Sequence, residues 1–248
     1  MRMQSKKTLS FEVVPSSSDV ARLVASEVIE LIRANPEASI GFPTGSSLQG
    51  AYSNLREAAR KGEFSLERAK VFLLDEYVGL PKGSRDSYLS FIQEEIQKPL
   101  GLPTGSLFFP DVHSRSLENA SQDFEERISS VGGLDLQILG IGTNGHIGFN
   151  EPGSAFDSTT RVVELSEDTR FANSRYFNGN LNAVPKQAIT QGISTIMSAK
   201  RIILVAVGSK KADAVERLLS GIVSEQFPAS ALHSHPNLRA LFDTLAYK

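Results

Sequence analysis

Apolar residues follow two spacings along the chain, and segments of the two kinds alternate. Short apolar runs, typical of buried strands, occupy residues 9–14, 38–42, 70–74, 134–141, 161–165 and 201–207. Between these runs, apolar residues at helical spacing, such as Val20, Leu23 and Val24, predict helices. The predicted helices lie between residues 16 and 35 and between 47 and 60, and over 84–97, 117–128, 210–219 and 238–245.

Strands that alternate with helices indicate one fold class. The pattern predicts an α/β, Rossmann-like fold with a mostly parallel central sheet and helices on both faces. The segment 161–185 is polar and irregular after its first strand, and we interpret it as a mobile covering segment, a helical lid. The sequence shows no internal repeat or interdomain linker, so residues 1–248 are expected to form a single domain.

The composition excludes several classes of protein. With 40% hydrophobic and 22% charged residues among 248, the chain has the usage of a globular protein and not of a disordered or fibrous one. The formal net charge of −2 provides no broad cationic field for nucleic acid or an anionic membrane surface. An anionic ligand must therefore be bound by a few local groups.

Targeting signals and cysteines are also missing from the sequence. The basic start, residues 1–7, does not lead into the apolar core of a secretory signal, and the apolar run 202–207 is too short to cross a bilayer. The absence of cysteine excludes disulfides, thiolate metal sites and cysteine nucleophiles. We therefore expect a cytoplasmic protein whose chemistry comes from Asp, Glu, His, Lys or Ser.

The first candidate for a binding site follows the strand at 38–42. Ligands of parallel sheets bind at the carboxyl ends of strands, and here the small residues PTGSS precede a helix. Free N–H groups and the dipole at a helix start suit a phosphate group. The loop lacks the Gly-Lys-Ser/Thr ending of a nucleotide P-loop, and a tight turn with a serine cap is an equal alternative on spacing alone.

The second candidate is Asp75, which directly follows an apolar strand. It could be a capping aspartate, but the next predicted helix begins near Ser84, too far for Asp75 to reach its first amides. A carboxylate delivered to the edge of the sheet suits the work of a general base.

The third candidate is the glycine-rich stretch 140–153. Its first glycines match the dinucleotide fingerprint G-x-G-x-x-G, but Gly148 and Pro152 interrupt the helix that this fingerprint requires, so we reject a dinucleotide site. The stretch also contains His146 and Glu151. An imidazole with a carboxylate near it can transfer protons, although a lone loop histidine is more often simply solvated.

The fourth candidate is Lys211, in the first turn of the helix predicted at 210–219. The helix dipole disfavours a cation there, and a bound anion would remove that penalty. The alternative is an ammonium group extended into water. We assign no metal site, because no histidine pair has helix-face spacing and His233 and His235 are followed by Pro236 with no acidic neighbour.

At these residues the sequence resembles the glucosamine-6-phosphate deaminase family along nearly its whole length. The stretches with the most specific likeness are LLDEY at 73–77, NGHIGFNEP at 144–152, DTRFANSRYF at 168–177 and VPKQAITQG at 184–192. The resemblance implies an aldose–ketose isomerase that converts glucosamine 6-phosphate to fructose 6-phosphate and ammonia. It implies no cofactor and no metal.

The resemblance also implies a role for each candidate residue. Asp75 would move a proton from C2 to C1 of the open-chain sugar, and His146 would open the ring, supported by Glu151 and Asn144. Many family members have aspartate in place of Asn144, and an amide can orient the histidine but cannot carry negative charge. The phosphate would be bound by Gly45, Ser46, Ser47, Arg175 and Lys211, with Thr44 against the sugar.

Longer members of the family carry an additional C-terminal segment used in allosteric control, whereas this sequence stops at Lys248. We therefore expect little allostery, a monomer or small homo-oligomer, and a small-molecule substrate as the partner.

Two other functions remain as alternatives. One is the related 6-phosphogluconolactonase, which should need neither Asp75 nor Glu151. The other is a sugar-phosphate sensor without activity, but the sequence shows no helix-turn-helix or basic patch.

Overall fold

Seven parallel strands form the main sheet of the computed structural model, which describes residues 9–247. In spatial order they are β1 (Phe11–Val14), β10 (Leu238–Asp243), β9 (Ile202–Ala206), β6 (Leu136–Gly140), β2 (Ser39–Phe42), β3 (Lys70–Leu73) and β5 (Leu107–Phe108). Most of their side chains are buried on both faces, which is why the strands appear in the sequence as continuous apolar runs. The expectation about a secretory signal at residues 1–7 lies outside the described residues.

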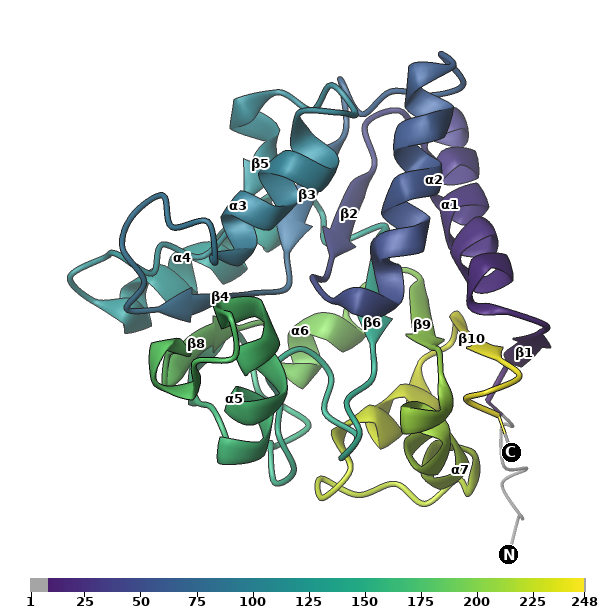
Figure 1. The fold of residues 1–248 in the computed structure, drawn as a ribbon. Helices are drawn as coiled ribbons and strands as arrows, with labels where there is room; N and C mark the ends of the chain where they lie inside the picture. Colours follow the sequence, from purple (N-terminus) through teal and green to yellow (C-terminus); the bar gives the residue numbers. More distant parts are fainter. Residues whose placement is uncertain (1–8, 248) are drawn as a thin grey trace, which may run out of the picture.

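Helices cover both faces of this sheet and confirm the predicted α/β class. One face packs against α1 (Ser17–Ala34), α2 (Gln49–Arg60) and α3 (Tyr88–Ile92), which continues as a π-helical turn over Gln93–Gln97. The other face packs against α4 (Leu117–Ser130), α6 (Ile193–Met197) and α7 (Ala212–Leu219). Strand side chains alternate between these two cores: Val71 and Leu73 face the first, and Phe72 faces the second. Figure 1 shows α1 and α2 side by side along one face.

The predicted helix boundaries follow from capping residues. Ser16 begins α1, because its hydroxyl accepts a hydrogen bond from the Asp19 N–H at 3.2 Å, and the helix ends before Asn35. Ser116 begins α4 in the same way, accepting from the Asn119 N–H at 3.2 Å. The serine before the apolar stripe therefore marks where each of these two helices starts.

A second, antiparallel sheet of three strands was not predicted as such. It consists of β4 (Asp75–Val78), β8 (Gln187–Thr190) and β7 (Arg161–Glu164), in that order. The strand expected at 161–165 exists, but it belongs to this sheet and not to the parallel one. The rest of the covering segment (residues 161–185) contains α5 (Glu167–Asn173) and a 3-10 turn at Ser174–Phe177, so the segment is helical, as predicted.

The helix predicted at 238–245 is wrong, because β10 occupies Leu238–Asp243. This strand pairs with β9 on one side and β1 on the other, and nearly all its side chains are buried. A run of six residues is too short for its apolar spacing to separate strand from helix, so the pairing with two neighbouring strands determines its structure. The strands β4, β5 and β8 and the helix α6 were also missed, being only two to five residues long.

The order of the strands determines where a ligand site forms. From β2 the chain adds β3 and β5 toward one edge, then returns to β6 and adds β9 and β10 on the other side. The topology therefore reverses between β2 and β6, and ligands of open α/β sheets bind outside the carboxyl ends of strands at such a point. In Figure 1 the arrowheads of β2 and β3 point toward the part of the molecule where α5 lies.

Candidate active site

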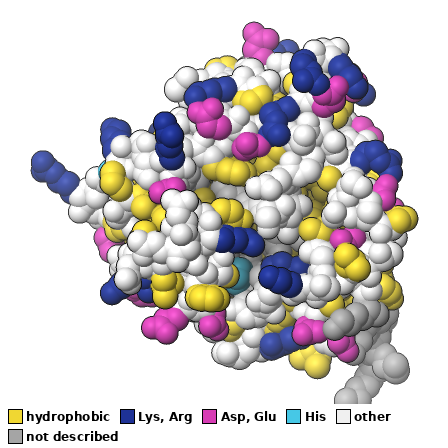
Figure 2. Space-filling model, in the orientation of Figure 1, with side chains coloured by type: hydrophobic (Ala, Val, Ile, Leu, Met, Phe, Trp, Pro, Cys, Tyr) yellow, Lys and Arg dark blue, Asp and Glu magenta, His cyan; other side chains and the backbone are white. Residues whose placement is uncertain are grey.

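A cavity of about 960 Å³ lies at this reversal point. Its lining includes nine of the residues predicted from the sequence: Thr44, Gly45, Ser46, Ser47, Asp75, Asn144, His146, Arg175 and Lys211. Figure 2 shows the hollow on one face of the molecule, with a histidine side chain in it and basic side chains beside it. Glu151, the remaining predicted residue, lies directly behind the cavity wall, next to His146.

The loop after β2 has the backbone shape of an anion-binding turn. Gly45 has φ 123°, a conformation that favours glycine, and it leads into a 3-10 turn at Ser46–Leu48 and then into α2. The turn and α2 together present a helix start to the cavity. From the covering segment, an Arg175 guanidinium N–H donates to the Ser46 hydroxyl at 3.4 Å.

Two cations converge beside this loop. Lys211 is the last residue of a 3-10 turn at Ser209–Lys211. Gly208 precedes this turn and fixes it, because its N–H donates to the buried Asp243 carboxylate at 3.0 Å. Burial lowers the pKa of the Lys211 ammonium below its usual value, and the nearby Arg175 lowers it further. Like charges held together in a partly dry site favour a bound anion, which would relieve both effects.

Asp75 is a buried carboxyl group at the cavity, with only 6% of its surface exposed. Burial raises the pKa of Asp75 well above its usual value, and the charge of the adjacent Glu76 raises it further. Glu76 points away into the protein, where it accepts hydrogen bonds from the N–H groups of Tyr77, Tyr88 and Leu89 at 2.7–3.0 Å. Asp75 is thus a carboxyl group suited to accept a proton.

His146 lies in the loop after β6, in contact with a carboxylate and an amide. Its Nδ1 is 3.8 Å from Glu151 Oε2, an ion-pair distance, and has no hydrogen-bond partner. The Asn144 side chain joins the two residues: its Oδ1 accepts from the His146 N–H at 3.2 Å, and its Nδ2 donates to Glu151 Oε2 at 2.8 Å. Asn144 therefore holds Glu151 and the histidine backbone together.

The imidazole of His146 is favoured in its neutral form. Burial lowers its pKa, the charge of Glu151 opposes this, and the charge of Lys211 lowers the pKa further. Gly142 allows the ring to lie here, because a Cβ at that position would be 2.3 Å from the imidazole. The close approach explains why residue 142 is a glycine, one of those in the stretch 140–153 that match the dinucleotide fingerprint.

Strand β8 joins the two reactive elements. At the point where the chain leaves β3, the Gln191 side chain donates to the Leu73 carbonyl at 3.0 Å. The Thr190 hydroxyl accepts from the Phe149 N–H at 3.1 Å, in the histidine loop. Asp75 and His146 are therefore fixed relative to one another through the stretch VPKQAITQG. The sequence shows the likeness of this stretch to the family but assigns it no role.

Several polar residues at the site were not predicted. The Tyr77 hydroxyl accepts from Tyr88 at 3.1 Å and from Asn173 of α5 at 2.9 Å. Ser166 and Thr169, at the start of α5, both donate to Glu151. Thr169 and Asn173 belong to the stretch DTRFANSRYF, whose likeness to the family could have pointed to them. Their partners are side chains of distant segments, and the spacing of residues in the sequence does not reveal such contacts.

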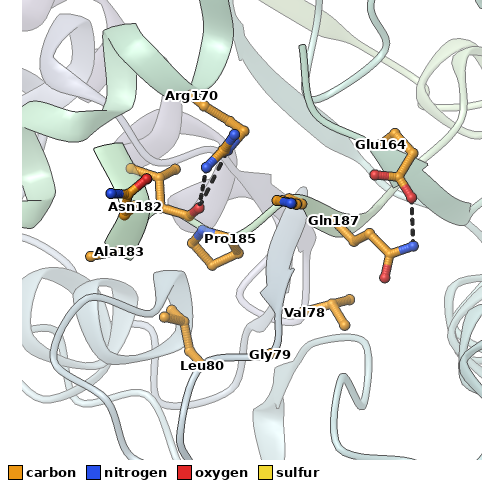
Figure 3. Close-up of a pocket in the computed structure, with 11 residues that line it drawn as sticks. Val78, Gly79, Leu80, Glu164, Arg170, Asn182, Ala183, Pro185 and Gln187 are labelled. Atoms are coloured by element: carbon orange, nitrogen blue, oxygen red, sulfur yellow. Dashed lines mark hydrogen bonds between the residues drawn. The ribbon is translucent and has the colours of Figure 1, made fainter. Parts of the chain in front are cut away.

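A second cavity, of about 490 Å³, lies on the other side of the covering segment. Figure 3 shows Arg170 donating to a backbone carbonyl beside Pro185, and a hydrogen bond between Glu164 and Gln187. None of the predicted site residues lines this cavity. Within residues 9–247 no group of three or more His, Cys, Asp or Glu side chains could hold a metal ion, and none of the helices is long and apolar enough to span a membrane.

The fold is a doubly wound α/β sheet of the Rossmann-like class, with a buried carboxyl group, an imidazole and two cations in a cavity at its reversal point. Residues 15–240 match the family described as glucosamine-6-phosphate isomerases/6-phosphogluconolactonase. The chain belongs to this family.

Relatives and solved structures agree with this placement. Glucosamine-6-phosphate deaminases from Beutenbergia cavernae and Oceanobacillus iheyensis are 43% and 42% identical, over 94% and 92% of this chain and 90% of each relative. A solved structure described as a monomeric glucosamine-6-phosphate deaminase is 38% identical, with a TM-score of 0.93, over 96% of this chain and 98% of that chain. The 6-phosphogluconolactonase from Trypanosoma cruzi has a TM-score of 0.77 over 99% of this chain and 98% of that chain, but at 19% identity it shows the fold alone.

The raised pKa of Asp75 has a consequence for stability. A carboxyl group whose pKa is higher in the folded than in the unfolded state favours folding while protonated, and this contribution is lost as pH rises. We expect Asp75→Asn to raise the melting temperature by a few degrees at pH 8 and by less at pH 5, while Asp123→Asn, at an exposed position of α4, changes little. Thermal unfolding at the two pH values measures this, and a less stable Asp75→Asn variant at pH 8 would contradict it.

Proposed function

We propose that the protein converts glucosamine 6-phosphate to fructose 6-phosphate and ammonia. The observation that carries the proposal is the meeting, in one cavity, of the buried Asp75, the neutral His146 and the cations Arg175 and Lys211. Relatives at 38–43% identity are glucosamine-6-phosphate deaminases, and they cover nearly the whole chain. The enzyme would need no cofactor and no metal, since proton transfers and water suffice.

The phosphate is bound first. The phosphate dianion accepts hydrogen bonds from the N–H groups and hydroxyls of Gly45, Ser46 and Ser47. Arg175 binds it through its planar guanidinium group, and Lys211 through the point charge of its ammonium group. Thr44 lies against the sugar. Because the loop and the cations are at one end of the cavity, the phosphate fixes which end of the hexose points toward the carboxyl group.

His146 then opens the sugar ring. Its neutral imidazole accepts the proton of the anomeric hydroxyl and returns a proton to the ring oxygen, which leaves an open-chain aldehyde. Glu151 stabilises the imidazolium that forms between the two transfers, and Asn144 holds Glu151 in place. An amide at position 144 supplies orientation without charge, so the imidazolium relies on a single carboxylate.

Asp75 performs the isomerisation. Its carboxylate removes the proton from C2 to give a cis-enolamine and returns a proton to C1, which leaves a ketimine at C2. Water adds at C2 and ammonia leaves, so that one water is consumed for each fructose 6-phosphate formed. A raised pKa makes Asp75 a stronger base than an exposed aspartate, which suits removal of a carbon-bound proton.

The 6-phosphogluconolactonase activity is the alternative that the family description leaves open. A lactonase hydrolyses an ester and has no carbon-bound proton to move, so it gives no reason for a buried base at position 75. The solved structures described as 6-phosphogluconolactonases also share only 16–20% identity with this chain.

Incubation with each substrate separately tests the proposal. We expect ammonia and fructose 6-phosphate from glucosamine 6-phosphate, and no hydrolysis of 6-phosphogluconolactone above the uncatalysed rate. Asp75→Asn should reduce kcat by about 10²–10⁴-fold, the range for loss of a general base, while the protein still binds the substrate. Lactone hydrolysis without ammonia release from the amino sugar would overturn the proposal.

The phosphate assignment predicts different effects for two neighbouring lysines. Lys211→Met should raise KM for glucosamine 6-phosphate by about tenfold or more, because it removes one of two charge-assisted contacts to the dianion. Lys210 also lines the cavity, but its side chain is exposed, so Lys210→Met should change KM by less than about twofold, in line with the small effect of exposed charges. Steady-state kinetics at constant ionic strength measures both, and equal changes in the two variants would contradict the assignment.

We also propose that the protein works as a monomer or small homo-oligomer in the cytoplasm, with the sugar phosphate as its partner. The cysteine-free sequence supports a reducing compartment, and one similar structure is described as monomeric.

A further inference from the structure

The Glu151 carboxylate is bound from two sides. Its Oε2 faces the histidine loop, at 2.8 Å from Asn144 Nδ2 and 3.8 Å from His146 Nδ1. Its Oε1 accepts hydrogen bonds from α5: one from the Ser166 hydroxyl at 3.1 Å and one from the Thr169 hydroxyl. One oxygen of the carboxylate therefore belongs to the acid–base pair and the other to the covering segment.

The two hydroxyls differ in what else they do. Ser166 is the N-cap of α5, since its Oγ also accepts from the Thr169 N–H at 3.2 Å. Thr169 is the buried residue of α5, with 5% of its surface exposed. Threonine is a poor helix former, and at this position its hydroxyl serves Glu151 and not the helix. An apolar side chain of the same shape would fill the space equally well, so packing alone does not explain the hydroxyl.

We propose that Thr169 is a positioning residue for the acid–base pair, whose hydroxyl holds the Glu151 carboxylate toward His146 when α5 covers the site. This inference rests on the proposed function, because it extends the ring-opening role of His146 to the segment above it. Asn144 holds one oxygen, and Thr169 together with Ser166 holds the other, so the carboxylate cannot turn away from the imidazole while these bonds exist.

The neighbouring Arg170 provides a matched control on the same helix. Its guanidinium points to the opposite side, where Nη2 donates to the Val184 carbonyl at 3.2 Å (Figure 3). The same Nη2 also donates to the Leu181 carbonyl at 3.1 Å. Arg170→Gln should loosen the covering segment without touching Glu151. Comparing the two variants separates positioning of the carboxylate from the general stability of the segment.

The charges around His146 determine what the experiment should show. Glu151 is the group that raises the pKa of the imidazole, and Lys211, from the turn before α7, lowers it. Asp75 from β4, Lys210 from the same turn as Lys211, and Asp168 and Arg175 from the covering segment line the same cavity. Without the Thr169 bond, Glu151 Oε1 is held by Ser166 alone. The carboxylate then spends less time near the ring and stabilises the imidazolium less, so the titration midpoint of His146 should fall.

The test is a titration of the His146 ring by NMR in the free protein, with the signal assigned from a His146→Gln variant. Thr169→Val should lower the midpoint measurably, and Thr169→Ser and Arg170→Gln should leave it where it is. With glucosamine 6-phosphate, Thr169→Val should lower kcat by about tenfold, the effect of losing a hydrogen bond to a charged group, with KM nearly unchanged, and Thr169→Ser should restore kcat. Thr169→Ala repeats both measurements without a β-branched side chain.

An unchanged midpoint in both Thr169→Val and Thr169→Ala would overturn the inference, as would an equal shift in Arg170→Gln. A loss of thermal stability as the only effect would assign Thr169 a structural role and overturn it too. If the wild-type protein releases no ammonia, the proposed function fails, but the titration still decides whether Thr169 controls the pair. The two failures are therefore distinguishable.

Discussion

The site depends on a carboxyl group that is kept out of water where the chain leaves the main sheet. Asp75 is the first residue of β4 and pairs with Thr190, so its backbone is fixed by the small sheet while its side chain reaches the cavity. Burial that raises its pKa costs stability at neutral pH and provides basicity. The Gln191 contact to Leu73 and the hydrogen bonds to Glu76 hold this arrangement in place.

The covering segment contributes to three parts of the site. Arg175 reaches the loop after β2, Asn173 binds the Tyr77 hydroxyl, and Thr169 binds Glu151. A segment with these contacts helps to build the cavity wall and does more than cover the cavity. Substrate phosphate between Arg175 and Lys211 would strengthen the same arrangement, because it neutralises the cations that otherwise repel one another.

The sequence predicted five of the seven parallel strands and nine of the residues that line the cavity. Local patterns identified Asp75, His146 and Lys211, whereas Thr44, Asn144 and Arg175 were assigned only through the resemblance to a known family. Buried strands appear as apolar runs, and the residues that follow them are brought to one edge by the topology. What it could not predict depends on contacts between distant segments. The strand at Leu238–Asp243 is defined by its two neighbours, and the antiparallel sheet by pairing between Asp75–Val78 and Gln187–Thr190. The partners of Glu151 on α5 were missed for the same reason, and the predicted mobility of residues 161–185 stays a prediction.

The most direct test of the account follows the proton that Asp75 is proposed to move. Glucosamine 6-phosphate labelled with deuterium at C2 is turned over in ordinary water, and the product is analysed for deuterium at C1. Transfer by a single carboxyl group predicts that part of the label reaches C1 in the wild-type protein, with the rest exchanged into water, and that Asp75→Asn mobilises the label at least about 10²-fold more slowly. Loss of the label from C2 at an unchanged rate in Asp75→Asn would contradict the account.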